Sequence, residues 1–248
     1  MSRWKAAAIH LSISACIAAI AAGLIFGLWY PPAYRSAAGA DQLVLLLIGV
    51  DVTLGPLLTL VVYKAGKRGL RFDLAMIALF QCSAFLYGMS VVTRARPAFV
   101  VAAIDRFALV PANDLDRADL AKGSKPEFRS LSWTGPRLVG AQLPTDAKAR
   151  TDLLFGSVGG GKDIESLPEY YVDYATVVPG LLTHAKPIDD LIGKHPTSRE
   201  TIETFLADHD HAAADTVWLP VQGPRASVTM FLDRRTGIPL GALPLDPW

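Results

Sequence analysis

Three long apolar runs fill the first third of the chain: Ala6 to Tyr30, Gln42 to Tyr63 and Leu74 to Thr93. They contain 25, 22 and 20 residues, and Asp51 is the only formally charged residue in any of them. A bilayer core about 30 Å thick is crossed by about 20 helical residues, so each run predicts a membrane-spanning helix. Because the number of crossings is odd, the residues after the third run are predicted to lie across the membrane from Met1.

The basic residues predict on which side of the membrane the chain begins. Six of them precede the first run or lie in the loop between the second and third runs: Arg3, Lys5, Lys64, Lys67, Arg68 and Arg71. The loop between the first and second runs holds only Arg35. The positive-inside rule therefore places the N-terminus in the cytoplasm and the segment after the third run in the periplasm or outside the cell.

The first run also has features of a secretory signal peptide. Ser2 to Lys5 resembles a charged leader segment, and Ala38-Gly39-Ala40 resembles a cleavage site. However, the apolar core of a signal peptide has only about 7–15 residues, and this run is much longer. We therefore expect the first run to be retained as a membrane anchor.

Charge separates the two parts of the chain. Nine basic and three acidic residues precede Phe99, whereas fifteen basic and twenty acidic residues follow it, so the overall charge of +1 combines a basic membrane part with an acidic outer part. An acidic domain is poorly suited to nucleic acid, and none is expected as a partner. Cys16 and Cys82 both lie within apolar runs, which predicts an outer domain held together by its core without disulfides.

The outer segment alternates strand and helix signals. Phe99 to Val110 is an apolar, β-branched run that predicts a strand or a bent pair of strands. Weaker signals predict a short helix near Asn113 and a strand from Pro136 to Leu143, and capping patterns predict helices over Thr145 to Phe155 and Ser198 to Asp208. Three further runs separated by turn residues predict an antiparallel meander: Thr216 to Val221, Ala226 to Leu232 and Ile238 to Leu243.

These patterns together predict a membrane protein in two parts. Residues 1–97 form three transmembrane helices, with spans at about 6–30, 42–63 and 74–93. Residues 98–248 form a periplasmic α+β domain with a small antiparallel sheet.

Asp51 is the first candidate for a functional residue, because it lies near the middle of the second run. A carboxyl group at that depth is costly unless it is protonated or paired within a bundle. Gly55 and Pro56 follow and are expected to free backbone carbonyls and kink the helix. Gln81, at a similar depth in the third run, is the natural hydrogen-bond partner. Asp51 could serve as a structural clamp or as a grip on another membrane segment, and the sequence leaves both open.

Small residues recur every four positions along the first run, at Ala15, Ala19, Gly23 and Gly27. Such a stripe allows a second helix to approach closely. The partner could be another helix of the same chain or a helix of another protein. The full set of predicted helix contacts is Ala15, Ala19, Gly23, Gly27, Asp51, Gly55, Pro56 and Gln81.

Motifs with catalytic or metal-binding chemistry are weak in this chain. Gly156 to Lys162 fits the GxxxxGK pattern, but Asp163 stands where a phosphate-binding loop has a hydroxyl, so we interpret the segment as a loop. Asp208 to His211 places consecutive potential ligands on one short turn, where they seldom converge on a single metal. His184 and His195 are isolated among prolines. We therefore predict no catalytic residues, no cofactor and no metal.

Several short motifs in combination resemble the TfpX/TfpZ family of type IV pilin accessory proteins. The resemblance is strongest between Trp29 and Phe107 and extends over most of the chain. The motifs are Trp29-Tyr-Pro, Gly49 to Thr59, Gln81, Tyr87-Gly88, Ala95-Arg96-Pro97, Asp105-Arg106-Phe107, Phe231 to Gly237 and Asp246-Pro247-Trp248.

The resemblance implies a helper protein in the bacterial inner membrane that acts with a cognate type IV major pilin in pilus assembly and twitching motility, without an enzymatic reaction. Its implied mechanism is chaperone-like. The small-residue stripe and Asp51 would hold the pilin's membrane stem, while the outer domain would contact the pilin's head.

Two other classes of function remain open. A membrane-anchored sensor or transport-associated subunit could bind a small ligand with its outer domain, although only two short basic segments face the cytoplasm to carry a signal. A pilin-modifying enzyme would need several catalytic polar residues at one face of the membrane, and the sequence offers no such set.

Overall fold

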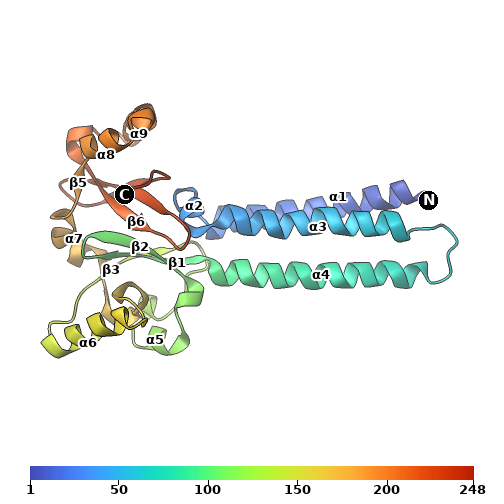
Figure 1. Cartoon of the computed structure of the whole chain (residues 1–248), viewed down its shortest axis with the longest axis horizontal. Coiled ribbons are helices and arrows are strands. Elements are labelled where there is room, and N and C mark those ends of the chain that lie inside the picture. Colours follow the sequence, from blue (N-terminus) through green and yellow to red (C-terminus); the bar gives the residue numbers. More distant parts are fainter.

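The computed structural model describes the backbone of all 248 residues and the side chains of all except Leu154, Ser157 and Val158. Three long helices extend from a globular domain as a rod, with the N-terminus at the far end (Figure 1). They are α1 (Arg3–Leu24, continued by a π-helical turn over Ile25–Trp29), α3 (Ala40–Val62) and α4 (Leu70–Ala95). All three are long and apolar enough to cross a membrane, which confirms the three apolar helices predicted from the sequence.

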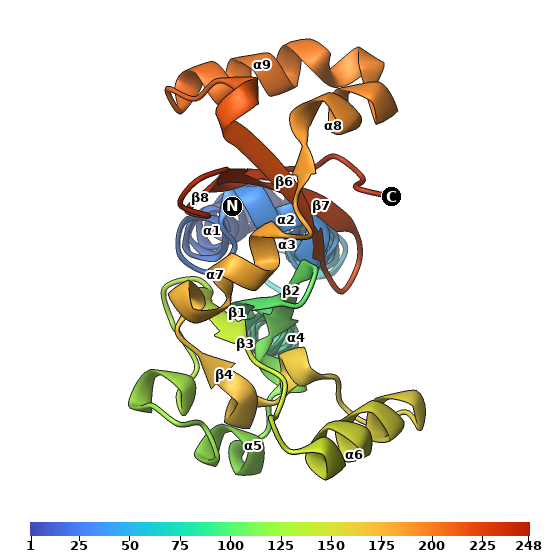
Figure 2. The same cartoon turned by 90° about the vertical axis from the view of Figure 1, so that its left-hand side faces the viewer.

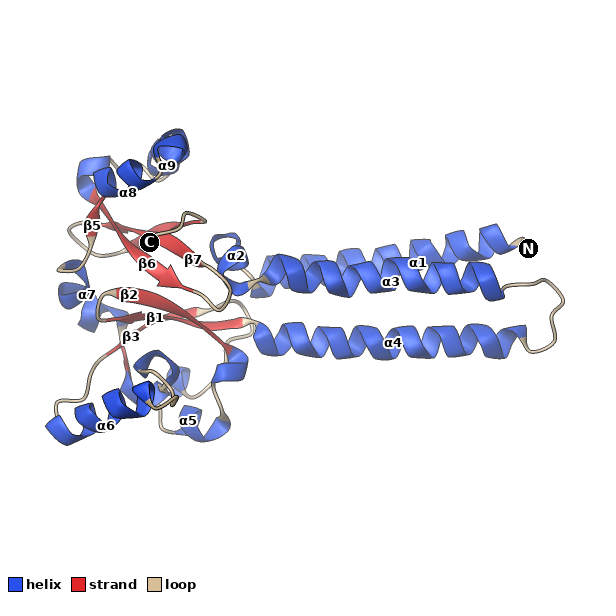
Figure 3. Cartoon of the chain, in the orientation of Figure 1, coloured by secondary structure: helices blue, strands red, loops and turns tan.

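The outer domain combines eight strands with short helices (Figure 3). The strands are β1 (Pro97–Ala103), β2 (Arg106–Pro111), β3 (Arg137–Ala141), β4 (Tyr171–Val172), β5 (Lys186–Pro187), β6 (Thr216–Gln222), β7 (Ser227–Asp233) and β8 (Pro239–Leu243). The helices are α5 (Arg117–Ala121), α6 (Ala147–Val158), α7 (Tyr174–Leu182), α8 (Ile188–Lys194) and α9 (Arg199–Asp208), while the short helix α2 (Arg35–Ala38) joins α1 to α3.

The sheet is mixed and has eight strands, so it is larger than the predicted small sheet, and two of its strand pairings are parallel rather than antiparallel. Its order is β4-β3-β1-β2-β6-β7-β8, with β5 paired to β6. β1 runs parallel to β3, and β2 runs parallel to β6. Each parallel pair joins two strands that are far apart in the sequence. Turn residues next to a strand therefore do not predict these pairings. The meander β6-β7-β8 is antiparallel as predicted, because short turns link its strands.

The sheet has two halves that meet over a short stretch. β2 and β6 pair only where Phe107 and Ala108 lie beside Val221 and Gln222. Figure 2 shows α7 lying near this junction, with α8 and α9 on one side of the domain and α5 and α6 on the other. The central hydrophobic cluster combines side chains of both halves with Ile25, Val44 and Val92 from the long helices. The rod and the domain therefore share one core at their junction.

Two helices that the sequence interpretation left as proline-rich loops are present. α7 contains Pro179, which removes only one backbone donor from a helix whose Leu181 is buried in the core. α8 begins directly after Pro187 and carries Asp189 and Asp190 in its first turn, where the helix dipole favours acidic side chains. Packing against the sheet therefore outweighs the local effect of the prolines.

Candidate functional site

The three long helices enclose a groove around the predicted residue Asp51. α3 contacts both α1 and α4, and a groove of about 290 Å³ opens between α1 and α4. Its walls are His10, Ile13, Ser14 and Ile17 from α1 and Ala78, Gln81, Cys82, Phe85 and Leu86 from α4, and Asp51 is its only residue from α3. Two further hollows, of about 350 and 150 Å³, lie on the α3–α4 side and also reach Asp51.

Gln81 is the centre of a polar cluster that ties the three helices together. Its Nε2 donates to the backbone oxygen of Asp51 at 2.7 Å and to Oγ of Ser14 at 3.1 Å. Because a backbone oxygen can only accept, this orientation leaves Oε1 to accept from Nε2 of His10 at 2.8 Å. Nδ1 of His10 lies 2.6 Å from Oγ1 of Thr59, so a neutral imidazole with its proton on Nε2 satisfies every bond.

Gly55 lets Gln81 reach α3. A β-carbon at residue 55 would overlap the Gln81 side chain amide, so only glycine leaves room for the two helices to approach here. Gly88 plays the same part beside Leu47, whose Cδ1 would lie 2.5 Å from an added β-carbon. α3 continues through Pro56, which is buried and cannot donate to the carbonyl one turn earlier.

The carboxyl group of Asp51 is left without a partner. Asp51 is 7% exposed, and its Oδ1 is enclosed with no hydrogen bond to any described group. The amide of Gln81 bonds to the backbone of Asp51, whereas the sequence suggested a bond to its side chain. Two of the predicted residues are thus in contact, but the contact leaves an unsatisfied acceptor among apolar side chains.

The small-residue stripe of α1 faces away from the other two long helices. Ala15, Ala19, Gly23 and Gly27 are all exposed, and nothing lies within 4 Å of a β-carbon added at either glycine. The face of α1 that packs on α3 is a different one, which includes Ser14, Ala18, Ala21 and Ile25. At 100° per residue, the two faces are roughly 150° apart around the helix. Contact of the stripe with another protein stays a prediction, and it does not contact α3 or α4.

Two of the motifs that carry the resemblance lie at the junction of rod and domain. The hydroxyl of Tyr30 donates to the backbone oxygen of Val92 at 3.0 Å, which links the outer ends of α1 and α4. Arg96 is buried, donates to the backbone oxygen of Ser132 at 3.1 Å and lies 4.2 Å over the ring of Trp133. These contacts hold the rod at a defined angle to the domain.

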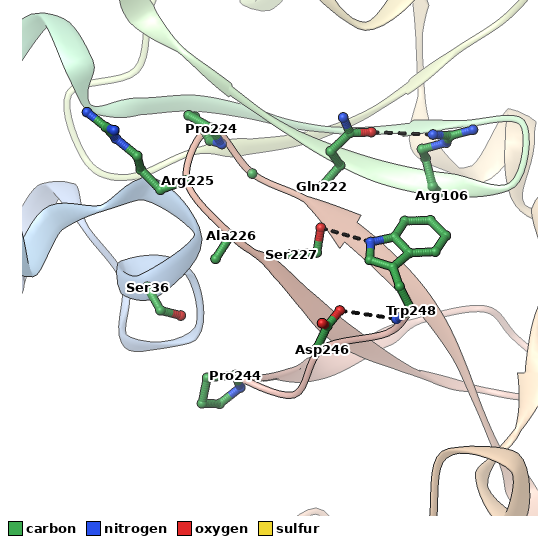
Figure 4. Close-up of a pocket in the computed structure, with 11 residues that line it drawn as sticks. Ser36, Arg106, Gln222, Pro224, Arg225, Ala226, Ser227, Pro244, Asp246 and Trp248 are labelled. Carbon is green, nitrogen blue, oxygen red and sulfur yellow. Dashed lines mark hydrogen bonds between the residues drawn. The ribbon is translucent and has the colours of Figure 1, made fainter. Parts of the chain in front are cut away.

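A second hollow, of about 750 Å³, lies in the outer domain beside α2 (Figure 4). Figure 4 shows Arg106 and Arg225 at opposite ends of it, with Asp246 and Trp248 between them. Its polar groups bond mainly to one another: Arg106 to the side chain of Gln222, and Trp248 to the side chains of Ser227 and Asp246. The hollow is open and of mixed charge, so its chemistry favours no particular ligand.

The remaining sequence motifs have structural partners. Lys162, the lysine of the GxxxxGK pattern, bonds to Asp119 at 2.6 Å and to Asp116 at 3.2 Å, while Ser157 and Val158 of that pattern lie outside the described side chains. His209 stacks on Phe205 with ring centres 4.2 Å apart, and His211 pairs with Asp233. Among the described residues no group of side chains is arranged to hold a metal ion.

Three members of the polar cluster were missed at the sequence level: His10, Ser14 and Thr59. Each is an uncharged polar residue within an apolar run, whereas the predicted set was built around the charged Asp51, its expected partner Gln81 and the small-residue stripe. His10 and Ser14 are four residues apart, so they share one face of α1. Polar residues inside membrane helices usually face the bundle, and this rule could have identified them.

Comparisons with known proteins agree with the architecture. A family model described as "Fimbrial assembly protein FimB" matches residues 1–39. Two fimbrial assembly proteins of Dichelobacter nodosus, of serogroups I and E1, are each 30% identical over 238 residues, covering 94% of this chain and 92% of theirs. A third, of serogroups C1 and C2, is 39% identical over 113 residues, which cover 45% of this chain and 86% of its own. No solved structure gives a significant match. With relatives aligned over nearly its full length, this chain belongs to the family of fimbrial assembly proteins.

Proposed function

We propose that this chain is an inner-membrane helper that holds the membrane helix of a cognate type IV major pilin during pilus assembly, and so supports twitching motility. The proposal combines the fimbrial assembly role for which the relatives of serogroups I and E1 are named with the groove in the helix bundle. The observation that carries it is Asp51, a buried carboxyl that no described group of the chain satisfies. Such a residue within a membrane helix is expected to serve a partner.

The mechanism is chaperone-like, with one change from the arrangement that the sequence suggests. The stripe lies roughly 150° around α1 from the side chains of α1 that line the groove at Asp51, so a single stem helix is too narrow to contact both the stripe and Asp51. We assign the stem to the side of the bundle that carries Asp51. The outer domain would then contact the pilin's head, and the reaction would require no enzymatic step.

The proposed topology supports this division of roles. The basic loop between α3 and α4 holds Lys64, Lys67, Arg68 and Arg71, which favours a cytoplasmic position for it. The outer domain would lie in the periplasm, on the same side as the head of a membrane-held pilin. Reporter fusions after Lys67 are expected to be active in the cytoplasm, and fusions after Val110 in the periplasm. A cytoplasmic signal at Val110 would remove the proposed contact with the head.

The function itself is tested in the native host. Deleting the coding sequence should reduce surface pili and twitching while pilin is still synthesised, and the full-length chain supplied in trans should restore both. The tagged chain, extracted in mild detergent, should bring the pilin with it. Normal piliation in the deletion strain, with no pilin in the purified fraction, would refute the proposal and favour a ligand-binding role for the outer domain.

A further inference from the structure

The groove between α1 and α4 has a feature that neither the family nor the proposed function assigns. It is lined mostly by apolar side chains, has a volume of about 290 Å³ and reaches Asp51. Oδ1 of Asp51 is enclosed and lacks a hydrogen bond within the described chain. An unsatisfied acceptor in apolar surroundings carries a penalty that a suitable donor would remove.

The neighbouring donors of Gln81 and His10 are bonded elsewhere. Both hydrogens of the Gln81 amide are used, one by the backbone oxygen of Asp51 and one by Oγ of Ser14. The ring N–H of His10 is given to Oε1 of Gln81. None of these groups bonds to Oδ1 of Asp51 in the structure, which leaves this oxygen open to a donor from another molecule.

The shape of the groove indicates a helix as its occupant. α4 packs little against the rest of the chain. Of the residues in its most apolar 18-residue stretch, 6% are buried, compared with 33% in the corresponding stretch of α3. A helix placed between α1 and α4 would contact both walls, lie over α3 and complete a four-helix bundle with Asp51 facing its interior. The walls include Ser14, Ala78 and Cys82, whose small side chains allow close approach. A lipid chain could fill the space, but it carries no hydrogen-bond donor for Asp51.

We propose that the groove between α1 and α4 binds a single membrane helix of the pilin, and that this helix brings a hydroxyl, amide or amine donor to the carboxyl of Asp51. This inference rests on the proposed function, because it takes the pilin as the source of the helix. It goes beyond that function by naming which of the hollows at Asp51 receives the helix and which chemical groups the helix brings.

Two native cysteines provide the test, because they lie on different faces of the bundle. Cys82 lines the groove, whereas Cys16 is exposed and follows directly after Ala15 of the stripe. Full-length tagged protein with only Cys82 (C16A) or only Cys16 (C82A) is expressed in the native host. A third variant, with both native cysteines replaced and Ala84→Cys added, samples the α3–α4 side, which Ala84 lines. A benzophenone maleimide on the single thiol is activated by light, and the products are identified by mass and by pilin antibody.

The pilin is expected to crosslink to Cys82 and not to Cys16 or to the cysteine at position 84. Adding Asp51→Leu to the Cys82 variant should lower the yield about three- to tenfold, the range for one hydrogen bond between membrane helices. Asp51→Asn keeps an acceptor oxygen and should retain most of the yield. Equal amounts of each variant in the membrane fraction confirm that the changes act on binding and leave insertion intact.

Other outcomes overturn the inference in distinguishable ways. If pilin co-purifies but crosslinks from Cys16 or from position 84, the function stands and the groove is the wrong face. If Cys82 yields only lipid adducts, or its pilin adduct is unchanged by Asp51→Leu, the groove does not use Asp51 to hold a helix. If pilin neither co-purifies nor crosslinks and piliation is normal without the chain, the proposed function fails as well.

Discussion

The outer domain and the helical rod differ in whether their buried polar side chains find hydrogen-bond partners within the chain. In the domain, Trp218 and Tyr171 are fully buried, and their polar atoms bond to the backbone oxygens of Pro187 and Glu165. In the rod, Val92 is the one buried residue of the fully described helix α4, and the buried Asp51 of α3 has an unpaired oxygen. Exposed apolar side chains are expected in lipid, so the unpaired carboxyl is the informative difference. This difference supports the proposal that the rod, rather than the domain core, receives the membrane helix of a partner.

The largest expected effect is in the domain core. Trp218→Ala removes a fully buried side chain from the cluster formed with α8 and α9, and should lower the free energy of unfolding by about 3–5 kcal/mol. Leu79→Ala, at an exposed position of α4, should change it little, because the leucine faces lipid. Resistance of the domain to protease in detergent measures both. An equal loss of protease resistance in both variants would contradict the distinction between a well-packed domain and a loosely packed rod.

Within the rod, replacing a glycine by alanine should destabilise the bundle only where the glycine lies against a neighbouring helix. Gly55→Ala places a methyl group against the Gln81 amide and should destabilise the α3–α4 contact by about 1–3 kcal/mol. Gly23→Ala meets nothing within 4 Å and should be neutral or slightly stabilising. The rate of irreversible unfolding of the purified full-length chain in detergent reports loosening of the bundle, and it should rise only for Gly55→Ala. A similar rise for Gly23→Ala would mean that the stripe already has a partner in the bundle.

The smallest expected effect is a pH dependence in the domain. Hydrogen bonds from the side chain and backbone of Thr236, with a further one from His211, lower the pKa of Asp233 to about 2, from an ordinary 3.8. The bond from His211 to the backbone oxygen of His209, followed by its pairing with Asp233, raises the pKa of His211 above 6.5. The carboxylate's contribution to stability is therefore complete above its ordinary pKa and is lost as the pH falls towards 2. The histidine's contribution is complete below 6.5 and is lost as the pH rises through its raised pKa.

Both contributions are present together between about pH 4 and 6.5, so thermal unfolding of the domain should show a shallow optimum there. Asp233→Asn should flatten the acid side of this curve. An optimum that persists unchanged in the variant would assign the pH dependence to other groups.

The sequence predicts elements well where local signals decide them. The apolar runs predict the three long helices, and the turn at Asp233 to Gly237 predicts the antiparallel pairing of β7 with β8, because Gly237 takes the positive φ of 68° that such a turn needs. The parallel pairs β1–β3 and β2–β6 depend on long connections, which no local pattern reports. No element was predicted over α7, since Pro179 within it is a local signal against a helix and the packing that forms the helix is not local.

The candidate site was predicted in part. Asp51 and Gln81 stand out in the sequence as polar residues at similar depths, and the structure places them in contact. The atoms that bond, and the role of His10, depend on the rotation of each helix about its axis, which an almost wholly apolar run does not specify. The same limit applies to the stripe, whose direction relative to α3 could be found only from the packed bundle.

The central claim is that the open side of the rod at Asp51, rather than the stripe, receives the pilin. A matched pair of alanine-to-leucine changes tests it: Ala78→Leu fills the groove between α1 and α4, and Ala19→Leu fills the stripe on the other face of α1. Co-purification of pilin with the tagged full-length chain from the native host is measured for both. We expect Ala78→Leu to reduce the recovered pilin severalfold and Ala19→Leu to leave it unchanged. Loss of pilin with Ala19→Leu and full recovery with Ala78→Leu would contradict the account.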